Sequence, residues 1–359
     1  MHVPDGFINA PVSVAAGVVA AGAVAVSLRG ARRELDEKIA PLAGLVAAFI
    51  FAVQMLNFPV AAGTSGHLLG GALAAILVGP YTGVLCVSVV LLMQGILFAD
   101  GGLTALGVNI TVMAVVTTVV AYAVFRGLVK VLPKKRRSVT VSAFVAAALS
   151  VPAAALAFTL VYAIGGTTDV PLGRVLTAMV GVHVLIGLGE AAITAFTVGA
   201  VIAVRPDLVY GARGLRQKLQ LRVGGKLVDA APDPKPELTP DPAPAPVPAH
   251  RTRNVWLTGL AASLVLAGVV SFYASASPDG LEKVAADKGI DAKVEEHAAA
   301  DSPLADYGVE GITDGRLSGG LAGVIGVGVT IAAGTGVFWA VRKRRTDEDS
   351  PAGAPRASV

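Results

Sequence analysis

Residues 68–98, LLGGALAAILVGPYTGVLCVSVVLLMQGILF, form one long apolar run, and its length decides how many times the chain crosses a membrane. A membrane-spanning helix needs roughly 20 apolar residues, so this run is too long for one crossing. Proline lacks a backbone donor and breaks a helix interior, and Gly79-Pro80 lies inside the run. We therefore expect two short helices, near 68–79 and 81–98.

The positions of the basic residues favour the same division. Other apolar runs fall at about 11–28, 39–57, 108–132, 139–164 and 174–204, and basic segments follow those that end near 28, 132 and 204. Two crossings within 68–98 place all three basic segments on one side of the membrane, as the positive-inside rule requires. This gives seven helices up to residue 204, with the N-terminus outside and the basic loops in the cytoplasm.

Composition places the chain among multi-pass membrane proteins. It is 54% hydrophobic and 15% charged, whereas soluble domains have about 45–50% apolar and about 25% charged residues. The basic residues behind the net charge of +4 lie between apolar runs. We therefore expect them to anchor the loops at the membrane surface, and we expect no nucleic-acid partner. The single cysteine, Cys86, lies in an apolar run and reads as a packing residue. We predict an all-α integral membrane protein.

A second unit follows the seven helices. Residues 229–250, DAAPDPKPELTPDPAPAPVPAH, predict an extended, semi-rigid linker. Two more apolar runs, at 255–275 and 318–341, have basic flanks that place the loop 276–317 outside and the C-terminus in the cytoplasm. We expect a unit at 1–222, a linker at 223–252, a two-helix unit at 253–345 and a disordered tail at 346–359.

The opening MHVPDGF has the chemistry of a metal chelator. It lacks the basic region of a signal peptide, so we expect Met1 to stay at the terminus. The Met1 amine, the His2 amide nitrogen and the His2 Nδ1 would close fused five- and six-membered rings around one ion. Planar nitrogen sites suit Ni(II) or Cu(II), and imidazole-rich sites also admit Co(II). One position in the plane stays open, and another imidazole is expected to fill it.

Four other histidines compete for that position. His67, in AAGTSGHLLGG, lies in an outward loop on the same side as the N-terminus. His183 lies within the seventh span, with Glu190 seven residues on and on the same helical face. His250 and His297 read as solvated surface. The spacing alone leaves simpler roles open: His67 could cap a helix, and His183, Glu190 and polar residues such as Asn109 could only bond between helices.

These motifs together resemble the substrate-binding (S) components of energy-coupling-factor importers for nickel and cobalt, the CbiM/NikM family. MHVPDGF, GTSGHLLGGALAAILVGP, FADGGLTALGVN and HVLIGLGEAAIT carry the resemblance over about residues 1–205. It implies a seven-helix bundle in the plasma membrane that binds the metal at its outer face. The implied ligands are the Met1 amine, the His2 amide and imidazole, and the His67 Nδ1. Asn109, His183 and Glu190 are candidates for side chains that hold the ligand residues in place without binding the metal themselves.

The segment SASPDGLEKVAADKGI resembles the PDGLE-type accessory component of the same importers, here fused through the linker. The resemblance implies that this two-helix unit is needed for transport without forming the metal site. The chain has no G-x-x-x-x-G-K-[ST] phosphate loop, so it is expected to be no enzyme. The implied partners are a transmembrane energising (T) component and two ATP-binding (A) subunits. The expected substrate is Ni(II) or Co(II), with nickel preferred because of the planar nitrogens, and no organic cofactor.

Two rival functions remain. GTSG at 63–66 also fits the nucleophile pattern of rhomboid intramembrane proteases, with Ser65 as nucleophile and His183 as base. That hypothesis gives His2 no role and leaves the accessory segment unexplained. A passive metal channel or a metal sensor, neither of which needs an ATPase, is the other alternative.

Overall fold

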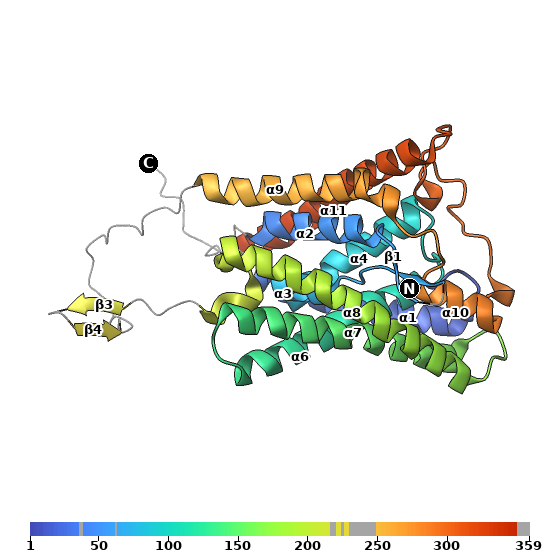
Figure 1. Ribbon diagram of the computed structural model, residues 1–359, viewed down its shortest axis with the longest axis horizontal. Helices are drawn as coiled ribbons and strands as arrows, with labels where there is room; N and C mark the ends of the chain where they lie inside the picture. The colour runs from blue at the N-terminus through green and yellow to red at the C-terminus, as the bar shows by residue number, and fades with distance from the viewer. Residues whose placement is uncertain (36–38, 62, 216–219, 224–225, 230–248, 350–359) are drawn as a thin grey trace, which may run out of the picture.

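Long apolar helices make up most of the chain in this computed structural model, which describes residues 1–35, 39–61, 63–215, 220–223, 226–229 and 249–349. Within these residues, seven helices are long and apolar enough to cross a membrane. The helices run side by side along the long axis of the molecule (Figure 1). The prediction of an all-α integral membrane protein is confirmed. The first unit has α1 (Ala10–Glu34), α2 (Ile39–Gln54), α3 (Gly71–Val78), α4 (Pro80–Leu97), α5 (Leu106–Asn109), the π-helix η1 (Ile110–Val116), α6 (Thr117–Val131), α7 (Arg136–Gly165) and α8 (Leu172–Val204), followed by 3-10 turns at Pro206–Leu208 and Tyr210–Leu215.

The predicted break in the long apolar run is present at Gly79-Pro80. Gly79 has φ +106°, which glycine adopts at little cost, and Pro80 is the first residue of α4. The Glu34 carboxylate, at the end of α1, accepts hydrogen bonds from the backbone N–H groups of Tyr81 (3.2 Å) and Thr82 (2.7 Å). An acid at a helix N-terminus is favourable, so α1 helps to fix where α4 begins.

Helix α3 is shorter than expected. Its 8 residues extend about 12 Å at 1.5 Å per residue, less than half of a bilayer core. The predicted first turn, at 68–70, is not helical: Gly70 is left-handed, with φ +88°, and the N–H groups of Leu69 and Gly70 bond to Glu190. Helices α2 (16 residues) and α3 are not among the seven helices of spanning length in the described chain.

A π-helix interrupts the fifth span. Helices α5 and α6 are continuous through η1, so that residues 106–131 form one spanning segment. A π-turn widens the helix locally and is frequent at functional sites. Asn109 lies at the junction, and its side chain is buried.

The C-terminal unit packs onto the first. It has α9 (Ala249–Gly268), a 3-10 turn η4 (Val270–Tyr273), α10 (Gly280–Lys288), two further turns η5 (Ile290–Lys293) and η6 (Ala305–Tyr307), and α11 (Gly315–Asp349). Helices α9 and α11 both contact α2, and α10 contacts α8. In Figure 1 the segment between α9 and α11 covers the end of the bundle where the N-terminus lies.

The predicted linker at 223–252 is only partly described. Strand β3 (Gln220–Val223) pairs with strand β4 (Lys226–Asp229), so the linker unit begins in paired strands. The extended structure was predicted for 229–250 and stays a prediction. Helix α9 already begins at Ala249. Residues 230–248 lie outside the described residues. Helix α11 extends to Asp349, so the first residues of the predicted tail at 346–359 are helical, and residues 350–359 lie outside the described part.

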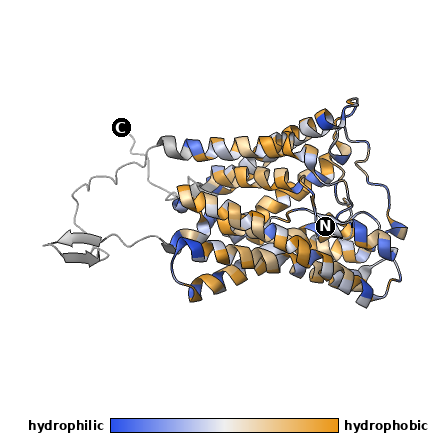
Figure 2. Ribbon diagram, viewed as in Figure 1, coloured by the Kyte–Doolittle hydropathy of each residue, from blue (hydrophilic) through white to orange (hydrophobic). Residues whose placement is uncertain are grey.

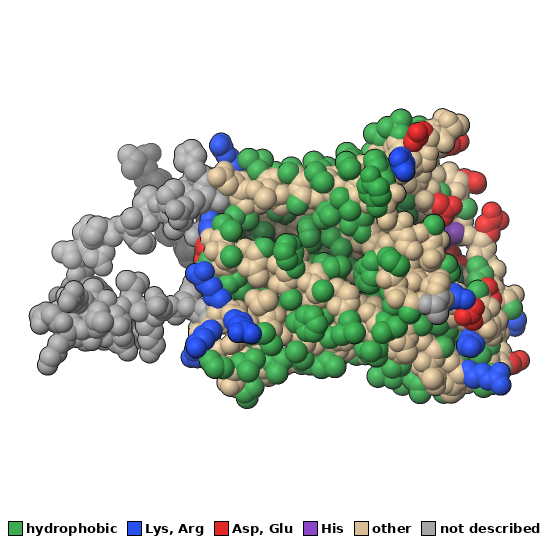
Figure 3. Space-filling model, in the orientation of Figure 1, with side chains coloured by type: hydrophobic (Ala, Val, Ile, Leu, Met, Phe, Trp, Pro, Cys, Tyr) green, Lys and Arg blue, Asp and Glu red, His purple; other side chains and the backbone are tan. Residues whose placement is uncertain are grey.

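The surface matches a membrane environment. Apolar residues dominate the sides of the bundle in Figure 2, and hydrophobic side chains cover the same sides in Figure 3. Acidic side chains gather at the end of the molecule where the N-terminus lies (Figure 3). Cys86 is buried, with its Sγ 3.4 Å from the Ala43 carbonyl oxygen, which confirms its packing role.

Candidate metal centre

The first residues of the chain form a buried, irregular segment held inside the end of the bundle. Met1 and Val3 are buried. The Val3 N–H donates to the Asn109 side-chain oxygen (2.8 Å), and the Asn109 amide donates back to the Val3 carbonyl (3.1 Å). The Gly102 N–H donates to the same carbonyl (2.9 Å). Asn109 therefore binds the backbone next to the predicted ligands, as a supporting residue would.

Asp5 closes the turn that follows. Its carboxylate accepts from the N–H groups of Leu103 (3.3 Å) and Thr104 (2.8 Å) and from the Thr104 hydroxyl (2.5 Å). Gly102 has to be glycine here, because a Cβ at this position would come within 2.3 Å of the Asp5 backbone nitrogen. The motifs MHVPDGF and FADGGLTALGVN thus form a single structure.

Three predicted ligand residues meet at this point. The Met1 amine lies 2.6 Å from His67 Nε2. The rings of His2 and His67 are stacked, with centroids 5.1 Å apart and planes at 16°. Helix α2 and the β1 (Phe58–Pro59) and β2 (Ser65–Gly66) pair carry the chain to His67. Residues 66 positions apart are thereby brought together.

The nitrogen of His67 that faces the amine differs from the expected one. Nδ1 was implied as the ligand atom, but it lies 3.0 Å from the Leu68 carbonyl oxygen, within hydrogen-bond reach. That contact turns the ring so that Nε2 points at Met1. A backbone partner for one ring nitrogen is the usual way in which the orientation of a metal-binding imidazole is fixed.

His2 has partners that no pattern in the sequence identified. Its Nδ1 lies 3.1 Å from Asp100 Oδ1, and its Nε2 lies 3.2 Å from Gln94 Oε1. The Tyr307 hydroxyl, from the C-terminal unit, donates to the other Asp100 oxygen (2.5 Å), and the Gln94 amide donates to the hydroxyl (2.9 Å). Burial lowers the pKa of His2 from 6.5 to about 4, against the opposing effect of Asp100. His2 is therefore neutral near pH 7.

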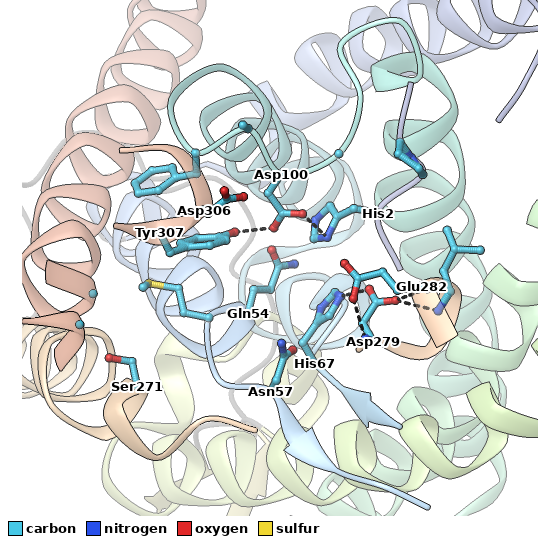
Figure 4. A pocket seen from close by; sticks show the side chains of 18 of the residues that line it. His2, Gln54, Asn57, His67, Asp100, Ser271, Asp279, Glu282, Asp306 and Tyr307 are labelled. Atoms are coloured by element: carbon cyan, nitrogen blue, oxygen red, sulfur yellow. Dashed lines mark hydrogen bonds and ion pairs between the residues drawn. The ribbon is translucent and has the colours of Figure 1, made fainter. Parts of the chain in front are cut away.

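Asp279 also belongs to the site, and sequence reasoning missed it. Its Oδ2 lies 2.5 Å from the Met1 amine and 3.5 Å from His67 Nε2. Burial alone would raise the pKa of this carboxyl, but the charged amine and His67 hold it well below its usual range. Donor atoms of His2, His67 and Asp279 all lie within 4.8 Å of one another. Figure 4 shows Asp279 and His67 pointing toward one another from different elements.

The resemblance drew attention to the PDGLE motif, 278–282, only as the mark of an accessory unit. Asp279 is 278 residues from Met1, and no sequence spacing relates the two. The clue available was the motif itself, a charged turn predicted on the same side as the N-terminus.

The two remaining candidates, Glu190 and His183, both lie on α8, close to the residues of the site. Glu190 is buried, and its carboxylate accepts from the N–H groups of Leu69 (2.7 Å) and Gly70 (3.2 Å), just after His67. His183 lies in the same helix, with Nδ1 2.7 Å from the Met179 carbonyl oxygen. Its Nε2 has no hydrogen-bond partner among the described residues. Met1, His67 and His183 line one small gap.

The site opens into a cavity of about 990 Å³ at the end of the bundle. The residues that line it include His2, Asp100, Asp279, Asp306 and Tyr307, seen in Figure 4. Both units thus contribute carboxyl groups to its wall. Acidic walls concentrate cations next to the site.

Ser65 is not arranged as a protease nucleophile. Its hydroxyl donates to the carbonyl groups of Ser277 (2.7 Å) and Pro278 (3.2 Å). No hydrogen bond joins Ser65 to His183 in the described part of the chain. The GTSG stretch instead fixes the loop that leads to Asp279.

His250 and His297 were both predicted to be solvated surface residues, and the structure describes the side chain of His297 but not that of His250. His297 lies against the first unit, with Nε2 3.1 Å from the Gly101 carbonyl oxygen, so it is only partly solvated. His250 lies in helix α9, and its side chain is outside the described part of the chain.

Comparison with known proteins covers both units. Residues 2–208 match the family model described as "Cobalt uptake substrate-specific transmembrane region", and residues 253–343 match the "PDGLE domain". A protein of Archaeoglobus fulgidus assigned as a fused nickel transport protein is 38% identical over 65% of this chain and 75% of its own. A cobalt transport protein of Geobacter sulfurreducens is 33% identical over 58% of this chain and 61% of its own. A crystal structure of a truncated transition metal transporter is 27% identical, with a TM-score of 0.50, and covers 56% of this chain and 99% of its own.

Proposed function

This chain belongs to the family of cobalt-uptake substrate-specific transmembrane proteins, and from that premise we propose that it captures Ni(II) or Co(II) through its free N-terminus. The proposed ligands are the Met1 amine, the His2 amide and imidazole, and His67. One observation carries the proposal: the Met1 amine is buried and lies 2.6 Å from His67 Nε2. Asp279 compensates the buried charge of the amine at 2.5 Å, and the amine and imidazole nitrogens are held close enough together to bind one ion.

The chemistry of the donors supports a transition metal. Amine, amide and imidazole nitrogens suit Ni(II), and imidazole-rich sites also admit Co(II). We propose a preference for nickel, since three nitrogens of one short segment can form a plane. Relatives are named for each metal, the fused nickel protein sharing the two-unit order of this chain.

We also propose how the capture unit is oriented and energised. The basic residues at the C-terminal ends of α1, α6 and α8 and just after them favour a cytoplasmic location for that end of the bundle, which would put the metal site at the outer face of the plasma membrane. The chain contains no phosphate loop. Energy for uptake would come from a transmembrane T component and two ATP-binding A subunits, with residues 1–222 as the capture unit and 253–345 as the accessory unit.

Equilibrium dialysis of Ni(II) and Co(II) against the purified full-length chain tests the ligand set. The His67→Ala variant should bind each ion far more weakly than the parent. His297→Ala is the matched control, because it removes an imidazole at the same end of the bundle whose partners, the Gly101 carbonyl and the Ala299 N–H, are not proposed ligands. Equal binding by the parent and His67→Ala would refute the proposed site.

Uptake into cells tests the energy source and the metal. Nickel uptake should disappear when the ATP-binding partners are inactivated, and an excess of nickel should suppress cobalt uptake. Uptake that persists without the ATPases would select a passive channel. Cobalt uptake that is unaffected by nickel would refute the nickel preference.

A further inference from the structure

The accessory unit contributes an acid to the metal centre, and the way in which this acid is held is informative. Asp279 is the N-cap of α10: its Oδ1 accepts from the N–H groups of Leu281 (2.7 Å) and Glu282 (2.9 Å). The Glu282 carboxylate in turn accepts from the Asp279 N–H (2.8 Å), which completes a capping box. One oxygen is therefore occupied by the helix, and Oδ2 is left to face Met1 and His67.

The segment that carries Asp279 is fixed to the loop that carries His67. The Ser65 N–H donates to the Pro278 carbonyl (2.9 Å), and the Ser275 N–H donates to the Asn57 carbonyl (2.7 Å). Gly280 lies so close to α8 that a Cβ there would come within 2.7 Å of Ile186 Cδ1. Asp279 and His67 therefore move as one body.

The distances match those between adjacent ligands of one ion. Imidazole and carboxylate ligands typically lie about 2.1 Å from the metal. Two such donor atoms are about 3 Å apart when their bonds to the metal are at right angles to one another. Asp279 Oδ2 lies 2.5 Å from the amine and 3.5 Å from His67 Nε2, on either side of that value. Asp279 Oδ2 is thus next to both the Met1 amine and His67 Nε2. An axial ligand, above a plane of nitrogens, is next to the nitrogens in this way.

Charge favours the same arrangement. A divalent ion bound by a deprotonated His2 amide and otherwise neutral nitrogens leaves one positive charge in a buried site. A buried charge without a partner is strongly unfavourable. The Asp279 carboxylate is buried at contact distance from two of the ligands, and it would make the loaded centre neutral.

We propose that Asp279 of the accessory unit is an axial ligand of the bound metal, an inference that rests on the function proposed above. In the metal-free state its Oδ2 holds the charged Met1 amine. The entering ion takes the place of one proton of the Met1 ammonium group and of the His2 amide proton. Both protons leave to water through the cavity, and Oδ2 exchanges the ammonium group for the metal. The centre then has four nitrogens and one oxygen, a set that suits Co(II) as well as Ni(II).

Spectroscopy of the full-length protein loaded with Ni(II) tests this. Four nitrogens in a plane give diamagnetic nickel, whereas a fifth donor on the axis favours paramagnetic nickel, which the Evans NMR method detects. The parent should be paramagnetic. Asp279→Ser should be diamagnetic and bind nickel about 10–100-fold more weakly, in the range typical for losing a residue that tunes a metal site. Serine is chosen because it still caps α10, while its hydroxyl is too short to reach the metal.

Glu282→Ala is the matched control, because it breaks the capping box without removing the carboxylate that faces the metal. It should keep the paramagnetism of the parent. A parent that is diamagnetic, or an Asp279→Ser variant with unchanged magnetism, would overturn the axial ligand while leaving the four nitrogens in place. Tighter nickel binding by Asp279→Ser would also overturn it and would make Asp279 a competitor for the amine. A parent that binds no nickel would refute the proposed function itself.

Discussion

Replacing Asn109 by alanine should loosen the N-terminal segment without touching a proposed ligand atom. The Val3 N–H is fully buried and donates to Asn109 at 2.8 Å. Leaving such a donor unpaired costs about 1–3 kcal/mol, and losing the return bond to the Val3 carbonyl costs about 0.5–1.5 kcal/mol. The carbonyl keeps its bond from Gly102 (2.9 Å). Docking of the segment should therefore weaken by about 1.5–4.5 kcal/mol, or roughly 10- to 2,000-fold.

Hydrogen exchange of the metal-free protein measures this directly. The Thr104 N–H donates to Asp5 (2.8 Å) and loses this partner when the segment undocks, so its protection should fall by up to that factor in Asn109→Ala. Thr111→Val is the control, because Thr111 lies two residues after Asn109, in the π-helix, and bonds the Ala16 carbonyl instead (3.4 Å). Unchanged protection of Thr104 in Asn109→Ala would refute the idea that this asparagine holds the segment in place.

Two further predictions concern the histidines. His67→Ala removes the nitrogen 2.6 Å from the amine, so nickel binding should weaken strongly with a changed visible spectrum, whereas His183→Ala should cost about 10–100-fold with the spectrum retained; the reverse pattern in titration and spectroscopy would invert the assignment. Docking should also depend on pH through His2, whose pKa is lowered to about 4 in the docked state and is near 6.5 when free. The undocked segment then binds a proton first, so Thr104 protection should be full above pH 6.5 and fall between pH 6.5 and about 4, by at most about tenfold per pH unit. A flat protection factor across that range would contradict the buried, neutral imidazole.

The fold could be predicted wherever local chemistry decides it. Gly79-Pro80 ends one helix and starts the next because of backbone geometry alone, and the structure breaks there. The late start of α3, at Gly71, could not be predicted, since the residues before it bond to Glu190, 120 residues away in the chain. The π-helix of residues 110–116 has no marker in its apolar sequence.

The candidate site also has a part that short motifs predict and a part that depends on distant contacts. His2 and His67 carry chemistry that is readable in short motifs, and the structure brings them together. The parts that escaped prediction are contacts between units: Asp279 at the amine, and Tyr307 on the Asp100 that holds His2. Such pairings are set by how α9 and α11 pack on α2, which no single motif encodes.

The central claim is that the free amine of Met1 binds the metal, and one added residue tests it. An alanine placed before Met1 turns the amine into an amide and moves the terminal charge by about 3.8 Å, one Cα spacing, away from its position 2.6 Å from His67. The same alanine added after Val359 is the control, and hydrogen exchange of the helices verifies folding in both. Titration with Ni(II) should show that high-affinity binding is lost in the first protein and kept in the second. Equal affinity in the two proteins would contradict the terminal-amine site.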